Sequence, residues 1–454
     1  MLPPPATSAD AAAEVKPPLL PPPPPLDGFP AEEFKARRDA LRAALPDGII
    51  LIRGAAEDDL PHNLPVRYRQ NAAFFYLTGV DTPGCYLALL PAGVPANTGL
   101  KGVKPEVREV LFVPARDGAM EQWSGAKLGP GEETQKLTGI EHAADAAKFW
   151  AAVTNWSRRA PTIHTLMPFG EQAKGSRPGA MIQRLADLTP TAQFKDCSLQ
   201  LAGLRIVKSP AEVERMRQAV ATTDAGHRVA RDLIAKGAGR RENEVEAAVF
   251  HTFRARGAQL GFSSIIGAGV NGSVLHYEHN DAELKTGDLV VVDIGARVGH
   301  YNGDVTRTYP VGGKFGPRQR EIYELVLACQ RDAVERFKVG VDSLDAMTER
   351  AREFYKASKS RAKNAAGEEK TMDAFFPHSL GHHLGLDVHD VNDAADRHTP
   401  LPIGSLITIE PGLYLPNEGI GVRIEDDYLL TEQGFVRVGE PLEATVEELE
   451  RAMR

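Results

Sequence analysis

Residues 290–311 read VVVDIGARVGHYNGDVTRTYPV, and this stretch constrains the fold more than any other part of the chain. Two β-branched runs, each typical of a strand in a half-buried sheet, carry one aspartate each, Asp293 and Asp304. An ionised carboxylate in such a place is costly unless it is paired or binds a metal. The stretch therefore predicts two strands of a sheet with a cation beside them.

The register of these two strands has two readings. A turn centred on Val298 and Gly299 would place Asp293 and Asp304 directly opposite each other on one face of an antiparallel pair. Asn302-Gly303 is itself a strong hairpin signal, and a turn there would separate the two aspartates. Each aspartate taken alone is more often a turn cap or the partner of a nearby arginine. The sequence leaves the register open.

Length and composition limit the classes of protein that fit. At 454 residues the chain is too long for one typical core, so two domains are expected. A net charge of −8 and a pI near 6.0 argue against a general binder of nucleic acid or anionic membranes. No apolar run reaches the ~18 residues of a membrane span. Three cysteines in no paired spacing, Cys85, Cys197 and Cys329, indicate a reducing compartment, and we expect a cytoplasmic protein.

The patterning along the chain predicts a tail and two domains. Residues 1–28 are proline-rich and lack the basic start and apolar centre of a secretion signal, so we expect a disordered tail with polyproline character. Residues 29–203 predict an α/β domain. Its expected elements are a helix at FPAEEFKARRDALRAAL and strands at GIILIRG, YRQNAAFFYLTGV, CYLALLP and REVLFVPARD. Ser209, Pro210 and Glu212 form a helix-start signature, and a second domain is expected over residues 204–454.

Four stretches of the second half concentrate ionisable residues in strand-like or glycine-rich surroundings. They are SVLHYEHND, with His276; residues 290–311, with the two aspartates; HSLGHHLGLDVHD, with four histidines; and the pair LITIEPGLYL and GVRIEDDYLL, with Glu410 and Glu425. Carboxylates suit Mn²⁺ or Mg²⁺, and an imidazole is compatible with Mn, Co, Fe or Zn. Two aspartates, two glutamates and one histidine carry more negative charge than one divalent ion needs, so we infer two ions. A dinuclear centre can lower the pKa of a shared water and polarise a carbonyl, which is the chemistry of amide hydrolysis at neutral pH.

At these motifs the sequence resembles the proline-specific metallopeptidases with the pita-bread fold, and most of all bacterial aminopeptidase P. The resemblance covers almost the whole chain after the tail. It implies an α/β N-terminal domain of the creatinase type and an α+β pita-bread catalytic domain. It also implies two divalent ions, typically Mn²⁺ with Co²⁺ or Zn²⁺ as alternatives, of which Asp304 and Glu425 would each bridge both. The five implied ligands are Asp293, Asp304, His382, Glu410 and Glu425.

The same resemblance assigns roles to residues around the metals. His276, His389, Glu410 and Arg423 are the implied catalytic residues. His378, Tyr414 and Trp123 are the implied substrate-binding residues, with Trp123 reaching the site of a neighbouring subunit in a homodimer or homotetramer. Ala72 and Ala73 depart from the pattern because relatives often carry Ser and Asp there, which puts the substrate or assembly contacts of that segment in doubt.

The implied activity is hydrolysis of the N-terminal Xaa-Pro bond, which releases the first residue from peptides whose second residue is proline. The main alternative is prolidase, which shares the two-domain layout and the five ligands but accepts only dipeptides. A non-catalytic peptide-binding module is a second alternative, and the five filled ligand positions disfavour it.

Overall fold

The computed structural model of the chain describes residues 19–21, 26–57, 68–168, 176–237, 239–391 and 397–454. It divides into two compact units, Met1–Ser198 and Leu199–Arg454. Most of the proline-rich tail expected at residues 1–28 lies outside the described residues, apart from short stretches at 19–21 and 26–28.

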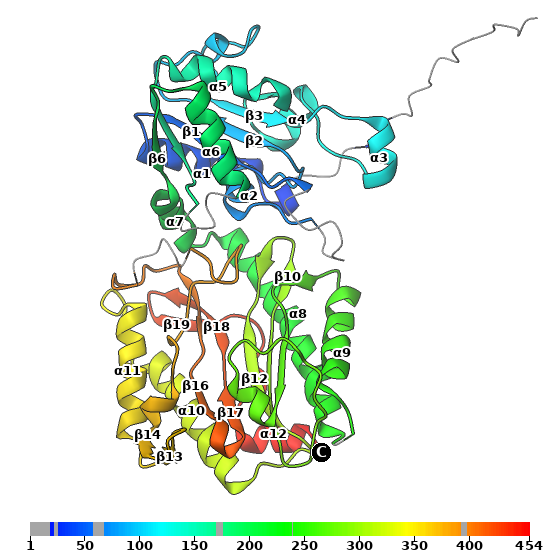
Figure 1. The fold of residues 1–454 in the computed structure, drawn as a ribbon, viewed down its shortest axis with the longest axis vertical. Helices are drawn as coiled ribbons and strands as arrows, with labels where there is room; N and C mark the ends of the chain where they lie inside the picture. Colours follow the sequence, from blue (N-terminus) through cyan, green and yellow to red (C-terminus); the bar gives the residue numbers. More distant parts are fainter. Residues whose placement is uncertain (1–18, 22–25, 58–67, 169–175, 238, 392–396) are drawn as a thin grey trace, which may run out of the picture. The chain divides into compact units, whose positions relative to one another are not determined.

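The N-terminal unit is built on one six-stranded sheet with the strand order β4-β3-β2-β1-β5-β6 (Figure 1). Its strands are β1 (Ile49–Arg53), β2 (Tyr86–Leu89), β3 (Glu109–Val113), β4 (His142–Asp145), β5 (Thr162–Thr165) and β6 (Gln193–Asp196). β1 runs antiparallel to β2 and parallel to β5, so the sheet is mixed. Helices α5 (Phe149–Ser157) and α6 (Arg177–Leu188) pack against strand residues in one apolar cluster that includes Trp156 and Leu185. The predicted helix at the start of this unit is α1 (Ala31–Ala44).

One predicted strand of this unit is wrong. The segment YRQNAAFFYLTGV contains a helix, α2 (Ala72–Thr78), instead of a strand. The Asn71 side chain accepts a hydrogen bond from the Phe74 amide at the start of the helix, and Gly79 ends it in the left-handed conformation (φ 64°). The aromatic residues that suggested a strand are buried all around the helix, so the capping residues decide the local structure over β-propensity.

The C-terminal unit places several small sheets between helices. Its longer strands are β8 (Ile265–Ala268), β9 (Leu289–Ile294), β12 (Val305–Pro310), β15 (Leu406–Ile409), β16 (Gly412–Leu415), β17 (Ile420–Arg423), β18 (Asp426–Thr431) and β19 (Gly434–Arg437). They form sheets in the orders β12-β9-β8, β15-β18-β19 and β16-β17. Figure 1 shows α8 (Pro210–Ala235) and α9 (Glu242–Ala255) on one side of these strands, and α10 (Pro317–Glu335) and α11 (Leu344–Ala357) on the other. One apolar core joins the strands and helices of this unit. The ionisable residues Asp293, Asp304, Glu410 and Glu425 lie at or next to strand ends.

The long helix α8 begins where the sequence predicts. The Ser209 hydroxyl accepts from the Glu212 amide, and the Glu212 carboxylate accepts from the Ser209 amide, so the capping box forms with Pro210 in the first turn. This cap fixes the start of the helix that backs the aspartate-bearing strands.

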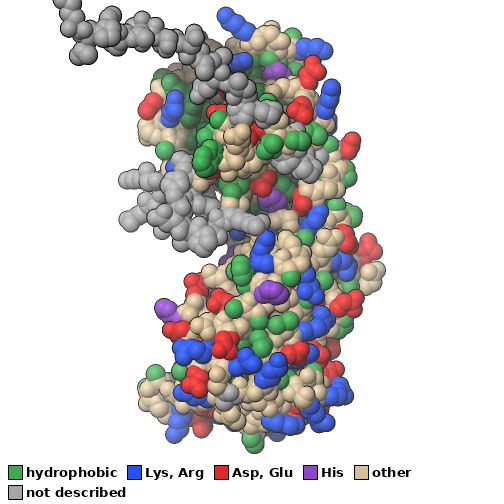
Figure 2. All heavy atoms as spheres, turned by 90° about the vertical axis from the view of Figure 1, so that its right-hand side faces the viewer, with side chains coloured by type: hydrophobic (Ala, Val, Ile, Leu, Met, Phe, Trp, Pro, Cys, Tyr) green, Lys and Arg blue, Asp and Glu red, His purple; other side chains and the backbone are tan. Residues whose placement is uncertain are grey.

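The surface mixes both signs of charge. On the face drawn in Figure 2, basic and acidic side chains are interspersed instead of gathered by sign. Within the described ranges, no helix is both long enough and apolar enough to cross a bilayer.

Candidate metal centre and active site

Three buried side chains meet in the C-terminal unit with the geometry of a metal site. Ligand atoms of Asp304, His382 and Glu425 all lie within 4.8 Å of one another. Nε2 of His382 is 3.7 Å from Asp304 Oδ2 and 3.4 Å from Glu410 Oε1. The sequence motifs that supply these residues are therefore brought to one point, as expected.

Asp293 lies in β9 and Asp304 directly precedes β12, and these strands pair in a register that neither reading of the hairpin anticipates. Val298 pairs with Tyr301 and Asp293 pairs with Thr306, so the turn lies at Gly299 and His300. Asp293 and Asp304 are thus not directly opposite each other. Asp304 precedes Thr306 by two positions and shares its face, so it lies diagonally across from Asp293.

Asn302 explains why the second hairpin signal is not used. It is the last residue of β11 (Tyr301–Asn302) and pairs with Arg297, so Asn302-Gly303 is not a turn. Its side-chain amide donates to the carbonyls of Gly385 and Leu386 in the histidine-rich loop. The residue that signalled a turn instead connects the strand to the loop that carries His382.

The two glutamates each follow a strand. Glu410 directly follows β15, and its amide donates to the Leu380 carbonyl (2.8 Å). Glu425 lies between β17 and β18, and its amide donates to the Thr306 carbonyl (3.0 Å). The Thr306 hydroxyl donates to Glu425 Oε2 (2.6 Å), so one residue of β12 holds both the backbone and the carboxylate of Glu425.

The histidine-rich loop orients its imidazoles through backbone carbonyls. His382 Nδ1 lies 3.0 Å from its neighbour's carbonyl, that of His383, and a proton on Nδ1 donates to that oxygen. This leaves Nε2 as a free lone pair beside the carboxylates, which is the tautomer a metal requires. The His389 ring packs edge-on against His382 at 4.3 Å between centroids. His378 contacts the Ser379 carbonyl through Nδ1 (2.8 Å) and the Tyr414 hydroxyl through Nε2 (2.9 Å).

Arg423 is a buried cation at this site. Its guanidinium donates to Asp293 Oδ2, to the Tyr414 hydroxyl (2.9 Å) and to the Thr306 hydroxyl (3.2 Å). The other oxygen of Asp293, Oδ1, is buried, and among the described residues it has no hydrogen-bond partner. A buried carboxylate oxygen left in this state fits a metal ligand.

Burial shifts the pKa values of the ligand residues in the direction that favours a cation. Burial raises the pKa of Asp304 and of Glu425 well above their usual range, and the neighbouring carboxylates raise it further. Burial raises the pKa of Glu410 to about 8, although Arg423 acts against the rise. Burial lowers the pKa of His382 to about 3, so its ring is neutral at pH 7. Clustered acids of this kind bind protons or metal cations more tightly than isolated acids do.

A cavity of about 550 Å³ opens onto these residues. The predicted residues that line it are His276, Asp293, Asp304, His378, His382, His389, Glu410, Arg423 and Glu425. Apolar residues that the sequence reading did not single out, Phe262, Ile265, Leu275 and Val388, complete the wall. Trp123 lies in the N-terminal unit, on α3 (Gly118–Ser124), where its side chain is 87% exposed.

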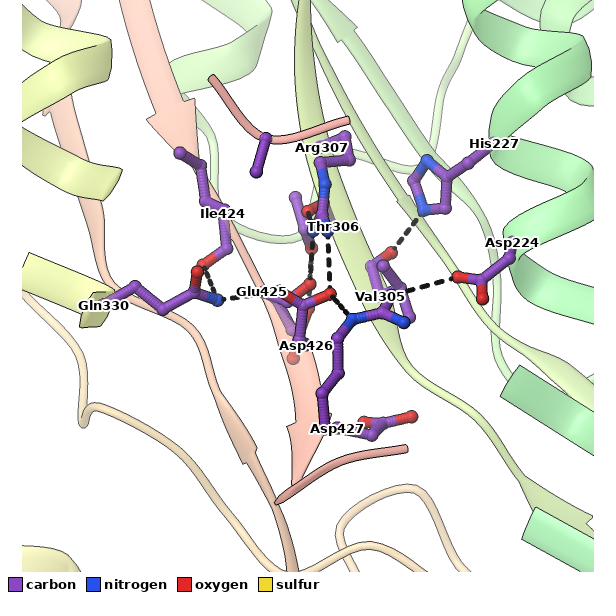
Figure 3. Close-up of polar contacts among 12 residues, drawn as sticks. Asp224, His227, Val305, Thr306, Arg307, Gln330, Ile424, Glu425, Asp426 and Asp427 are labelled. Carbon is purple, nitrogen blue, oxygen red and sulfur yellow. Dashed lines mark hydrogen bonds and ion pairs between the residues drawn. The ribbon is translucent and has the colours of Figure 1, made fainter. Parts of the chain in front are cut away.

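A buried ionic network lies behind Glu425 and was missed by the sequence reading (Figure 3). Asp426 accepts from Arg307 (2.8 Å), Arg437 (2.7 Å) and Gln330 (3.2 Å). The Arg307 guanidinium also donates to the Glu425 carbonyl (2.7 Å), which ties the network to a ligand residue. The signal available in the sequence was the Glu-Asp-Asp run at 425–427 beside a strand, with arginines in the neighbouring strands.

Glu242 is a second missed residue, and it holds the loop of His276. Its fully buried carboxylate accepts from the amides of Ala268 (2.7 Å) and Ala282 (2.8 Å) and from the hydroxyl of Tyr277 (2.8 Å). Tyr277 adjoins His276, whose own side chain is exposed to the cavity. The position of His276 therefore depends on its neighbour's hydrogen bond.

Comparison with known proteins agrees with the fold and the site. Residues 34–164 match the model of the aminopeptidase P N-terminal domain, and residues 214–432 match that of metallopeptidase family M24. Together with the donor set, these matches define a metallopeptidase that binds divalent metal.

Comparison with individual relatives identifies the family more narrowly. The Xaa-Pro aminopeptidase of Haemophilus influenzae is 33% identical over 432 residues, which cover 89% of this chain and 93% of the relative. A structure of a putative aminopeptidase P from Bacillus anthracis superposes with a TM-score of 0.81 at 29% identity and covers 94% of this chain and 98% of its own. The Xaa-Pro dipeptidase of Pyrococcus furiosus is 37% identical over 269 residues, 58% of this chain and 72% of the relative. The chain belongs to the Xaa-Pro aminopeptidase family, and the predicted family and pita-bread fold are confirmed.

Proposed function

We propose that five residues of the C-terminal unit, Asp293, Asp304, His382, Glu410 and Glu425, hold two Mn²⁺ ions for the reaction of this family. That reaction is metal-dependent hydrolysis of the N-terminal Xaa-Pro bond, which releases the residue before proline. The observation that supports the ligand set best is the convergence of three buried donors within 4.8 Å, with Asp293 and Glu410 lining the same cavity.

Charge supports two ions instead of one. When all are ionised, the four carboxylates and the buried Arg423 guanidinium beside them have a net charge of −3, which is more than one divalent ion neutralises. The unpartnered Oδ1 of Asp293 and the contact of Glu410 with His382 (3.4 Å) extend the donor set beyond the three clustered residues. Oxygen donors with a single imidazole suit Mn²⁺, and Co²⁺ or Zn²⁺ are the alternatives.

When bound, the metal pair supplies an activated water and polarises the carbonyl before proline. Side chains of the protein position and transfer the protons of that step. Glu410 accepts a proton from the attacking water and carries it towards the proline nitrogen, a role that suits a carboxylate that lines the cavity beside His382 (3.4 Å). His276 donates a hydrogen bond to the carbonyl oxygen as charge develops on it. His389, and Arg423 acting through Asp293, assist protonation of the leaving nitrogen.

The remaining cavity residues select the substrate. Proline has no N–H and a rigid ring, so recognition must rest on shape and on its carbonyl. His378 lines the cavity and contacts the Tyr414 hydroxyl at 2.9 Å, so we assign His378 to the proline side and Tyr414, which does not line the cavity, to acting through it. The carboxylates receive the free amine of the first residue.

Substrate length separates the proposal from its main alternative. The Xaa-Pro dipeptidase relative matches 58% of the chain, so likeness in the catalytic half does not by itself distinguish the two activities. The match of residues 34–164 to the aminopeptidase P N-terminal domain favours the aminopeptidase. Metal-stripped protein should be assayed on Xaa-Pro, Xaa-Pro-Yaa and Xaa-Ala-Yaa peptides with and without Mn²⁺. Cleavage of Xaa-Pro-Yaa only with metal supports the proposal, and cleavage of dipeptides alone refutes it.

Compartment and assembly complete the proposal. Cys85, Cys197 and Cys329 are free and buried, which suits the cytoplasm. We propose a homodimer or homotetramer in which the exposed Trp123 contributes to a neighbouring subunit's site. The non-catalytic alternative requires a chain that binds peptides without metal, and the assay above tests it as well.

A further inference from the structure

Within the described part of the proline-rich N-terminal segment, Leu20 contacts the N-terminal unit through its backbone. The Leu20 amide donates to Glu121 Oε2 (3.1 Å), and Nη2 of Arg116 donates to the Leu20 carbonyl. Both polar groups of one backbone residue are thus satisfied by the two members of one ion pair. The side chain of Leu20 is 44% exposed, so the contact is made by its backbone.

The ion pair that makes this contact is held in place independently of the tail. Arg116 and Glu121 are joined by two hydrogen bonds, Nε to Oε1 (2.6 Å) and Nη2 to Oε2 (2.8 Å). Glu121 lies on α3 but is only 3% exposed, and its pKa is lowered chiefly by the hydrogen bond from Arg116. The stem of Arg116 lies against Gly129, where an added Cβ would approach Arg116 Cγ to 2.6 Å. The pair is therefore a preorganised receptor for one N–H and one C=O.

An apolar cavity of about 430 Å³ adjoins the pair. Pro83, Pro114, Met120 and Leu128 line it together with Arg116 and Glu121. Leu19, Leu20 and Pro21 are not among the residues that line this cavity, so the contact with the tail is that of the Leu20 backbone with the ion pair.

The sequence of the tail limits which of its residues can hydrogen-bond to the ion pair. In PPLLPPPPPL (residues 17–26) most residues are prolines, which have no N–H to donate to Glu121. Leu20 has an N–H, and because it precedes Pro21 its backbone is biased towards the extended region. Leu19 and Leu26 also have an N–H, but of the three leucines only Leu20 precedes a proline, so it presents its donor in a polyproline-like conformation.

We propose that the Arg116–Glu121 ion pair is a receptor for the backbone of a proline-rich segment, and that the chain's own Leu20 binds it. We call this surface the tail receptor. It acts in cis and restrains α3, the helix that carries Trp123. The proposal concerns binding and does not depend on the catalytic roles proposed above.

The test uses the full chain and two substitutions of one residue. Leu20→Pro removes the N–H while keeping the extended conformation, and Leu20→Ala keeps the N–H and serves as the matched control. Hydrogen exchange of the α3 amides at 118–124 should speed up in Leu20→Pro and stay as in the parent chain in Leu20→Ala. Equal exchange in both variants would overturn the proposal. Protection of α3 that disappears on dilution of the parent chain would also overturn it, because the occupant would then be the tail of a second copy.

A peptide in trans tests the receptor itself. The synthetic peptide PPLLPPP (residues 17–23) should bind the Leu20→Pro chain, whose receptor is free, and bind the Leu20→Ala chain about tenfold or more weakly. The same peptide with an N-methyl group on its second leucine should lose about tenfold in affinity for the Leu20→Pro chain, as should the parent peptide for a Leu20→Pro/Glu121→Gln chain, since each change weakens a charge-assisted hydrogen bond. Binding that is unaffected by N-methylation, or equal for a peptide with alanine in place of every proline, would refute the receptor.

Discussion

Removal of metal should make the stability of the C-terminal unit fall as pH rises above neutrality. Burial raises the pKa of Glu410 to about 8, from an ordinary value of 4.5, and raises the pKa values of Asp304 and Glu425 as well. An acid whose pKa is raised in the folded state stabilises that state fully below its unfolded pKa, and this contribution is lost as pH rises through the folded pKa. Each such group should cost roughly 1.4 kcal/mol per pH unit in this window.

Histidines set the lower limit of the window. Burial lowers the pKa of His382 and of His227 to about 3, and that of His378 to about 4. These rings are neutral in the folded state and titrate around pH ~6.5 in the unfolded chain, so their contribution makes stability rise with pH up to about one unit above that value. Above about pH 7.5, where few unfolded histidines still bind a proton, the raised acids dominate the difference between the two states and the slope should be negative.

The assay is thermal unfolding of EDTA-treated protein at about pH 7.5, 8.0 and 8.5, above the titration of the unfolded histidines. For a unit of this size, 1.4 kcal/mol corresponds to a fall in Tm of roughly 3–6 °C per pH unit for one proton. The fall should be smaller in Glu410→Gln, which removes one of the titrating groups. With saturating Mn²⁺ the fall should disappear, because the metal takes the place of the protons. A metal-free Tm that stays level or rises between about pH 7.5 and 8.5 would show that the carboxylates are not buried together.

Three further predictions concern individual residues. Glu410→Gln should lower kcat on an Xaa-Pro-Yaa peptide by about 10²-fold or more, and near-normal turnover would remove Glu410 from proton transfer. Asp293→Asn should bind fewer than two Mn²⁺ per chain by elemental analysis, and full occupancy would contradict its role as a ligand. Tyr277→Phe should lower kcat by roughly tenfold in the parent chain, because it frees the loop of His276, but should cause no further loss in a His276→Ala background. Additive losses in this cycle would show that Tyr277 acts on stability or on another residue.

The site residues that the sequence predicts lie in stretches where ionisable residues recur in strand-like or glycine-rich surroundings. Asp293 and Asp304 stood out because carboxylates are costly in β-branched strands, and the structure brings Asp304 into one cluster with His382 and Glu425. The helix at 72–78 was not predicted, because its caps, Asn71 and Gly79, are weaker signals than a run of aromatic residues. In this short segment the two caps decide between helix and strand, although the sequence signal they give is weak.

The supporting residues were harder to predict, because their partners are distant in sequence. Asp426 accepts from Arg307, which is 119 positions away, and Glu242 accepts from Tyr277, which is 35 positions away. The local pattern of residues carries no information on which partners so far apart in the sequence will meet. The hairpin register failed for a related reason, since Asn302 is held by the carbonyl of Gly385 from a distant loop instead of forming a turn.

The network around Asp426 also limits how this protein can change. Arg307 and Arg437 share that one carboxylate, and Arg437 contacts Asp224 as well (3.2 Å). Replacement of any one member would leave a buried charge without its full set of partners. Simultaneous replacement of all four by apolar groups can leave the stability unchanged. We therefore expect single substitutions in this network to destabilise the fold, even though none of these four side chains lines the cavity. Engineering of this region should treat the four as one unit to be exchanged together or left alone.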